Sequence, residues 1–306
     1  MKLGIIVVYL VSEWSEKLLD LHLSQIEKNT RVPYIIYGSV NRLLPQFRQK
    51  LEQNPKVRIC NCLPTDLRSG YEHSFYLDQL VRFAVEDGAT HIVSLHVDSF
   101  PIRADWVEEL VGKLSNDCVL AAIMRGTHYG QNDRKPLSAC IFFPSEFYLK
   151  YQPTFLLSEF DIASPEYQHY CRQWEHVFES GVGYGFKIFA AGLSWYPLLK
   201  SNKVGDYPAF GNIYGDLIFH LGEAAWRPSV YGESAPNQGN RRSSLEFVSF
   251  LRNAKEKIKP MLPLGFRNLF ATPVQKMIIT PMYEYVRQQL LDNPEAYISY
   301  LRTGRK

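Results

Sequence analysis

The stretch His91-Ile92-Val93-Ser94-Leu95-His96-Val97-Asp98-Ser99-Phe100-Pro101 lies at the centre of the predicted fold. Residues 92–95 form an apolar run typical of a buried strand, and Pro101 closes the turn that follows it. Alternation along the extended segment places His96 and Asp98 on the same side, just past the strand. Ligands of open α/β sheets bind outside the carboxyl ends of the strands, so Asp98 is expected to reach a metal ion or a diphosphate. The alternative is that Asp98 caps a helix starting near Ala104.

Strands and helices alternate on both sides of this stretch. Strands are expected at residues 3–10, 34–37, 57–62, 119–124, 137–143 and 193–197, and helices at 13–26, 43–53, 72–86, 106–114 and 182–193. Residues 146–178 are aromatic and polar without a strand period, which predicts helical or irregular structure. This alternation predicts an α/β fold with a mostly parallel central sheet flanked by helices.

Composition divides the chain into three parts. Residues 1–226 carry the alternating pattern, residues 227–244 accumulate Pro, Gly, Ser and Asn as in a linker or mobile loop, and residues 245–306 are predicted to form a basic helical extension. From Arg241 onward there are twelve Lys and Arg against five Asp and Glu, so this end carries +7 in a chain with a net charge of +3.

Apolar runs, the N-terminus and the cysteines argue against a membrane-spanning or disulfide-rich secreted protein. No apolar run approaches the roughly 18 to 20 residues of a membrane-spanning helix. The first residues superficially resemble a signal peptide, but Glu13 comes early and no small-residue cleavage site follows, so they are interpreted as a first strand. The five cysteines form an odd set without a CxxC pair, and we expect reduced thiols in a cytoplasmic protein.

The common phosphate-binding and hydrolase motifs are missing. The turn after the first strand, Tyr9-Leu10-Val11-Ser12, contains no glycine, which excludes a dinucleotide fingerprint and a P-loop there. The run Gly181-Val182-Gly183-Tyr184-Gly185 has the wrong spacing and is interpreted as packing or flexibility. The sequence contains neither a GxSxG elbow nor an HExxH helix.

Two carboxylates, Asp98 and Glu179 at a predicted helix start, and two imidazoles remain as candidates for chemistry. His220 ends a second apolar run at residues 216–222, as His96 and Asp98 follow the first. Hard divalent cations prefer oxygen ligands together with substrate phosphates, while Mn²⁺ also accepts imidazole. Each histidine has the alternative interpretation of an ordinary core or surface side chain.

In this order the motifs resemble those of GT-A glycosyltransferases, especially family-2-like enzymes, over roughly residues 3–225. His96-Val97-Asp98 stands at the position of the DxD motif, and Phe178-Glu179-Ser180-Gly181 stands where the family has its catalytic acid at a helix start. The segment around His220 resembles the late histidine that can complete the metal site, and Tyr37-Gly38-Ser39 and Leu137-Ser138-Ala139-Cys140 also fit.

The resemblance implies transfer of a sugar, with inversion, from a nucleotide-diphosphate donor to an acceptor hydroxyl on a glycan or a lipid-linked acceptor. Asp98 and His220 would hold Mn²⁺ or Mg²⁺, and Glu179 would be the general base. The donor would be contacted by the five residues Tyr9, Ser39, Asp66, Asp78 and His96.

The sequence departs from the family pattern at two places. His96 replaces the first acid of DxD, and Ser180 follows Glu179 where a second acid is common, so Glu175 and Asp161 stay alternatives for the base. The change to His96 keeps open a non-catalytic relative that binds a nucleotide or a sugar. A sugar-nucleotide pyrophosphorylase would need a Gly-rich basic loop after the first strand, which residues 9–14 lack.

Two basic regions suggest further contacts. Arg125, Arg134 and Lys135 could touch phosphate, although a solvated loop is the alternative. The basic, apolar tail around residues 251–270 could lie on an anionic membrane surface as a peripheral contact, or pack back on the catalytic domain as a helical lid. No recognition motif indicates nucleic acid.

Overall fold

The computed structural model describes residues 1–11, 16–41, 43–67, 69–124, 135–172, 180–204, 210–222 and 283–305. Two units can be distinguished, one formed by Met1–Ala224 with Asn293–Lys306 and the other by Ala225–Asp292. In the second unit, residues 283–292 are helical. The predicted linker at 227–244 and the tail around 251–270 lie outside the described residues. The last residues of the predicted extension, from Asn293 onward, group with the sheet unit.

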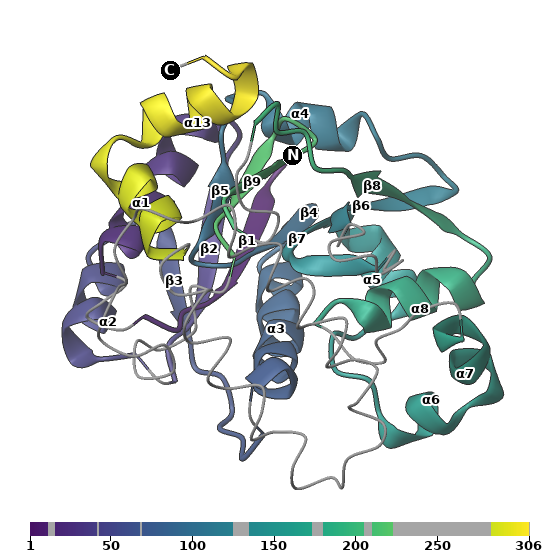
Figure 1. Cartoon of the computed structure of the whole chain (residues 1–306). Helices are drawn as coiled ribbons and strands as arrows, with labels where there is room; N and C mark the ends of the chain where they lie inside the picture. Colours follow the sequence, from purple (N-terminus) through teal and green to yellow (C-terminus); the bar gives the residue numbers. More distant parts are fainter. Residues whose placement is uncertain are drawn as a thin grey trace, which may run out of the picture. The chain divides into compact units, whose positions relative to one another are not determined.

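A seven-stranded sheet forms the centre of the first unit (Figure 1), in the order β3-β2-β1-β4-β7-β6-β8. Its strands are β1 (Leu3–Val8), β2 (Tyr34–Ser39), β3 (Val57–Cys60), β4 (His91–Leu95), β6 (Cys118–Met124), β7 (Pro136–Pro144) and β8 (Ser194–Leu198). Strand β7 runs antiparallel to its neighbours β4 and β6, and the other pairs are parallel. The predicted mostly parallel sheet is therefore confirmed.

Strand β1 is buried on both faces, as its continuous β-branched and apolar sequence predicts. Leu3, Ile5 and Val7 belong to one hydrophobic core, while Ile6 and Val8 belong to a second core on the opposite face. Because successive side chains of a strand point to opposite faces, this division shows that both faces of the sheet are covered.

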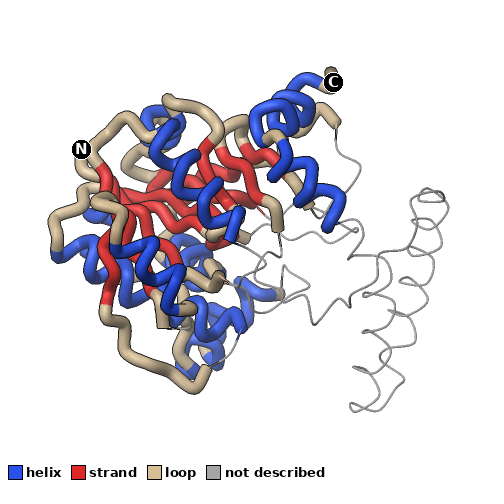
Figure 2. The backbone as a smooth tube through the Cα atoms, turned by 90° about the vertical axis from the view of Figure 1, so that its left-hand side faces the viewer, coloured by secondary structure: helices blue, strands red, loops and turns tan. Residues whose placement is uncertain are grey.

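Helices pack against the strands in both cores, and Figure 2 shows them on either side of the strands. Residues of α1 (Glu16–Asn29), α2 (Pro45–Glu52) and α4 (Trp106–Val111) pack into the first core. Residues of α3 (Ser69–Glu86), α5 (Ser145–Tyr151) and α8 (Val182–Ala190) pack into the second. The short helices α6 (Glu159–Ala163) and α7 (Pro165–Cys171) pack with α8 in a smaller cluster.

A second, antiparallel sheet of three short strands is the feature that positions the candidate site. It consists of β5 (Ser99–Pro101), β9 (Asn212–Tyr214) and β10 (Ile218–His220), in the order β5-β10-β9. The β9–β10 turn has Gly215 at φ 59° and Asp216 at φ 58°, the backbone of a tight hairpin turn. The pairing of β5 with β10 joins two segments that are more than a hundred residues apart in sequence.

The C-terminal helix α13 (Pro294–Thr303) lies in the same unit and contacts two of its elements. Glu295 accepts hydrogen bonds from Gln25 (3.2 Å) and Lys28 (2.6 Å) of α1. Arg302 donates two hydrogen bonds, of 2.7 and 2.9 Å, to the carboxylate of Asp216. Within the described residues, no helix has both the length and the apolar composition needed to span a membrane.

Close packing explains the glycine run at residues 181–185. Gly181 has φ 111°, and a Cβ there would lie 2.6 Å from the carbonyl oxygen of Pro136. A Cβ on Gly183 would lie 2.0 Å from the carbonyl oxygen of Thr154. Of the two interpretations of this run, the structure shows packing, because the backbone of α8 approaches its neighbours more closely than any side chain would allow.

Candidate metal centre

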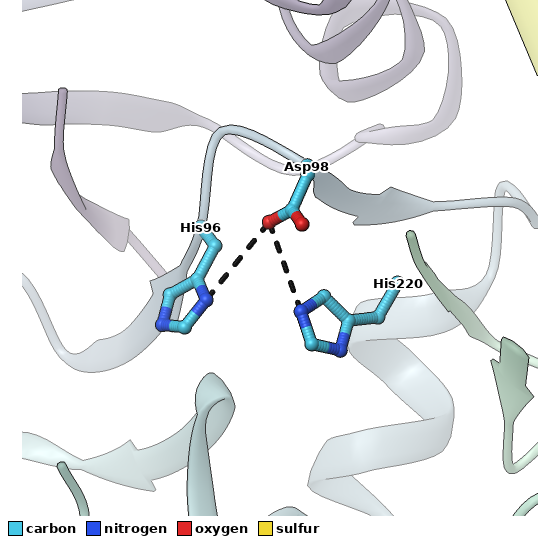
Figure 3. Close-up of side chains that lie close together, drawn as sticks. All are labelled: His96, Asp98 and His220. Atoms are coloured by element: carbon cyan, nitrogen blue, oxygen red, sulfur yellow. Dashed lines mark ion pairs between the residues drawn. The ribbon is translucent and has the colours of Figure 1, made fainter. Parts of the chain in front are cut away.

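The turn after β4 and the end of β10 bring His96, Asp98 and His220 together (Figure 3). His220 pairs with Ser99 in the β5–β10 ladder, and the backbone N–H of Leu221 donates to the carbonyl of Asp98 at 2.9 Å. These backbone contacts fix the histidine beside the carboxylate. The alternative that Asp98 caps a helix is wrong, because β5 intervenes before α4 begins at Trp106.

The three side chains form a compact set of possible ligands. The Oδ1 atom of Asp98 lies 3.9 Å from His96 Nδ1 and 3.7 Å from His220 Nε2. The potential ligand atoms all lie within 4.8 Å of one another. The Asp98 side chain is 4% exposed, and those of His220 and His96 are 13% and 26% exposed. One buried carboxylate oxygen thus faces two imidazole nitrogens, an arrangement that a divalent cation would bridge.

The environment keeps His96 in the form that a metal ligand requires. Burial, followed by the neighbouring rings of His73, His220 and His22, holds the pKa of His96 well below its ordinary value. The imidazole is therefore neutral near pH 7 and carries a free lone pair on one nitrogen.

Other side chains fix the His96 ring. Its Nε2 atom lies 3.0 Å from Ser138 Oγ on β7, and the His73 ring of α3 packs edge-on against it with centroids 4.8 Å apart. His73 Nδ1 lies 3.3 Å from the hydroxyl of Ser180. Burial lowers the pKa of His73 to about 4, so this ring too is neutral near pH 7.

Three of the residues predicted to contact the donor lie at the carboxyl ends of three adjacent parallel strands, β2, β1 and β4. Tyr9 follows β1, Ser39 ends β2, and the backbone N–H of Tyr9 donates to the Ser39 carbonyl at 2.9 Å. His96 follows β4, the other neighbour of β1. The Tyr9 ring is fully buried at a ring-centroid distance of 6.0 Å from His22, and its hydroxyl has no hydrogen-bond partner among the described residues. Ser39 donates to Asn41 Oδ1 at 3.1 Å.

The other two predicted donor residues do not directly follow β1, β2 or β4. Asp66 is exposed in the segment after β3. Asp78 is half-buried on α3, where its carboxylate accepts the backbone N–H groups of Phe155 (2.7 Å) and Leu156 (2.9 Å). The structure thus gives Asp78 a function in holding the loop before α6, a contact that its helical spacing does not reveal.

The base candidates fall into two groups. Glu179 and Glu175 lie outside the described residues, as do Arg125 and Arg134. Asp161 forms a capping box at the start of α6, where its carboxylate accepts a hydrogen bond from the hydroxyl of Ser158 at 2.6 Å.

Of the basic residues that could touch phosphate, Lys135 is described. It is fully buried, so it is not part of a solvated loop.

Sequence analysis missed His73 and His22 as parts of the site. His22 lies on the buried face of α1, with Nδ1 3.0 Å from the carbonyl oxygen of Ser99. The sequence did contain a signal, since each histidine lies in a predicted helix, at 13–26 or 72–86. A histidine on the apolar face of a helix is expected to be buried, and a buried imidazole needs a polar partner.

No protein-family model matches the sequence, and no curated protein sequence matches it. Among solved structures, S. aureus TarS 1–349 in complex with UDP-GlcNAc is similar at 12% identity and a TM-score of 0.47, covering 100% of this chain and 93% of that chain. Mouse xyloside xylosyltransferase 1 is similar at 10% identity and a TM-score of 0.41, covering 65% of this chain and 85% of that chain. The galactosyltransferase LgtC with donor and acceptor sugar analogues has 10% identity and a TM-score of 0.37, covering 64% and 73%. Two of these three proteins are sugar transferases by name.

Proposed function

We propose that the protein is a glycosyltransferase that moves a sugar from a nucleotide-diphosphate donor to an acceptor hydroxyl with the help of a divalent cation. The observation that supports this proposal is the cluster of His96, Asp98 and His220 beyond the carboxyl end of β4. This is the edge of an α/β sheet at which ligands bind.

The donor set fits a transition-metal ion. One carboxylate oxygen and two imidazole nitrogens suit Mn²⁺ better than Mg²⁺, because Mg²⁺ prefers oxygen ligands and Mn²⁺ accepts both. A bound cation would neutralise the negative charge that develops on the departing diphosphate. Asp98 would supply the anionic ligand, and His220 and His96 would supply neutral ligands. Tyr9 and Ser39, at the ends of the neighbouring strands, are proposed to line the donor side together with Asp66 and Asp78.

Glu179 is proposed to remove the proton from the acceptor hydroxyl as it attacks the sugar, which gives inversion. A single base suffices for direct displacement, in contrast to the two carboxylates of a glycosidase. The support is its sequence position, immediately before Ser180 and the start of α8. Because its carboxylate acts on the acceptor, Glu179→Gln should lower turnover and leave donor binding unchanged. We further propose a glycan or lipid-linked acceptor and a cytoplasmic location, with peripheral membrane contact through the basic tail.

Calorimetric titration of UDP, GDP, dTDP and CDP with and without Mn²⁺ tests the proposal. One nucleotide should bind in a Mn²⁺-dependent manner, and Asp98→Asn should abolish that dependence. Asp20→Asn, on the exposed face of α1, is the matched control and should bind as the wild type does. If no nucleotide binds, the proposed transferase is wrong. If a nucleotide binds equally well without a cation and no sugar is transferred, the protein is the non-catalytic relative that the change to His96 leaves open.

A further inference from the structure

We infer that Ser138 is a positioning residue that directs the Nδ1 atom of His96 toward Asp98 and His220. This inference rests on the proposed metal function of the cluster. It concerns a contact within the chain, between a hydroxyl on β7 and an imidazole after β4, at 3.0 Å.

The geometry separates the two nitrogens of His96. Nε2 faces the hydroxyl of Ser138, whereas Nδ1 faces Asp98 Oδ1 at 3.9 Å. A neutral imidazole has one N–H and one lone pair, and the partner of one nitrogen determines what the other can do. If Nε2–H donates to Ser138 Oγ, the lone pair of Nδ1 points into the cluster. A metal ligand needs this state, and a histidine ligand usually donates its second N–H to a nearby acceptor.

The Ser138 hydroxyl is well placed to act as this acceptor. The residue is only 1% exposed, so little water competes for the contact. Its backbone is held independently, because its carbonyl accepts the hydroxyl of Ser94 at 2.8 Å and its N–H donates to the Ser180 carbonyl at 3.2 Å. A change confined to the side chain therefore leaves the strand in place and removes the acceptor alone.

The ring of His73 adds a second restraint. It lies nearly perpendicular to the His96 ring, at 85°, which hinders rotation of His96 out of the cluster. His73 also contacts the Ser180 hydroxyl. Ser138 and His73 both reach the turn at Ser180, which directly follows Glu179 in sequence. The same two residues thus link the candidate metal ligand to Ser180, the residue that follows the proposed base in sequence.

Co²⁺ titration of the full chain tests the inference through affinity and the visible absorption of the bound ion. Loss of an outer-shell partner typically weakens metal binding by about 10- to 100-fold, so Ser138→Ala should bind Co²⁺ at least about tenfold more weakly than the wild type. It should also change the absorption spectrum, because the ligand field changes when His96 leaves. Ser138→Thr keeps the hydroxyl and should restore most of the affinity.

Ser145→Ala is the matched control, because it also removes a buried serine hydroxyl, one that donates to the Ala89 carbonyl. Ser145 directly follows β7, whose last residue pairs with His91, so the control lies at the opposite end of β4 from His96. It should bind Co²⁺ like the wild type. Equal weakening by Ser145→Ala, or wild-type affinity and spectrum in Ser138→Ala, would overturn the inference. If the wild type binds no Co²⁺, the metal function itself fails.

Nitrogen-15 NMR of the Zn²⁺-loaded wild type provides an independent readout of the protonated nitrogen. His96 should carry its proton on Nε2 and coordinate through Nδ1. A proton on Nδ1 would contradict the positioning by Ser138 even if the metal binds.

Discussion

Replacement of Asp78 by Asn should change how the stability of the protein depends on pH. Burial raises the pKa of Asp78 to about 7 from its ordinary value of 3.8, and the hydrogen bonds from Leu156 and Phe155 and the charge of Arg82 offset only part of that effect. A carboxyl group whose pKa is higher in the folded state favours folding while it is protonated. This contribution to stability is fully present when the pH is below the pKa of the aspartate in the unfolded chain. It is lost as the pH rises through the pKa of Asp78 in the folded protein, near 7.

The expected magnitude follows from the two pKa values. A tenfold difference in proton affinity is worth about 1.4 kcal/mol, and between pH 5 and pH 8 the linkage relation gives a loss of about 2 to 3 kcal/mol for the wild type. The amide that replaces the carboxyl group in Asp78→Asn cannot ionise, so the variant lacks this component. The weaker hydrogen bonding of the amide to the loop does not itself change with pH, and the effect of ionisation on the wild-type hydrogen bonds is already contained in the raised pKa.

Urea denaturation at pH 5 and pH 8, followed by tryptophan fluorescence, measures the difference. The free energy of unfolding of Asp78→Asn relative to the wild type should shift in favour of the variant at pH 8 by about 2 to 3 kcal/mol. A constant offset at both pH values would refute the reasoning. It would mean that the pKa of the Asp78 carboxyl group is not raised in the folded protein.

Two further substitutions test the packing and the C-terminal contact. Gly183→Ala should destabilise the protein by about 3 kcal/mol, because its Cβ would lie 2.0 Å from the backbone oxygen of Thr154. Gly112→Ala is the control, because a Cβ there would lie 3.4 Å from its nearest neighbour, a backbone oxygen. Thermal denaturation should show almost no loss of stability for this control. If both variants lost the same stability, the packing argument would be contradicted. Arg302→Ala and Asp216→Asn should show a coupling of about 0.5 to 1 kcal/mol in a double-mutant cycle of unfolding free energies, because the pair is bidentate but partly exposed. A coupling near zero would show that α13 is not held through this pair.

The sheet was predictable because its signals are local. The run from Leu3 to Val8 has no polar residue and is rich in β-branched residues, which is typical of a strand covered on both faces. Asp98 was predictable for the same reason, since it follows the apolar residues of β4 directly. The antiparallel direction of β7 was not predictable, because an apolar run does not encode the direction in which it pairs.

The contacts between distant segments explain what the sequence could not reveal. Asp78 shares the helical spacing of any polar residue at the edge of an apolar face, and only the loop that packs on it, at Phe155 and Leu156, makes it a hydrogen-bond acceptor for two backbone N–H groups. His220 was identified by its place after an apolar run, but its position beside Asp98 depends on the pairing of β5 with β10. Ser138 lies in a segment that fits the family pattern, but the sequence does not reveal its contact with His96, which depends on the pairing of β7 with β4.

The histidine at residue 96 determines how this site differs from one built on two acids. A second carboxylate beside Asp98 would add negative charge at a nearly buried position, where an unpaired charge is unfavourable without a bound cation. A neutral imidazole avoids that penalty, and the hydroxyl of Ser138 holds it in place. The consequence is a weaker electrostatic attraction for the cation and a preference for ions that accept nitrogen. Substitution of His96 by Asp should therefore shift cation preference from Mn²⁺ toward Mg²⁺. This expectation follows from ligand chemistry alone and does not depend on which sugar or acceptor the protein uses.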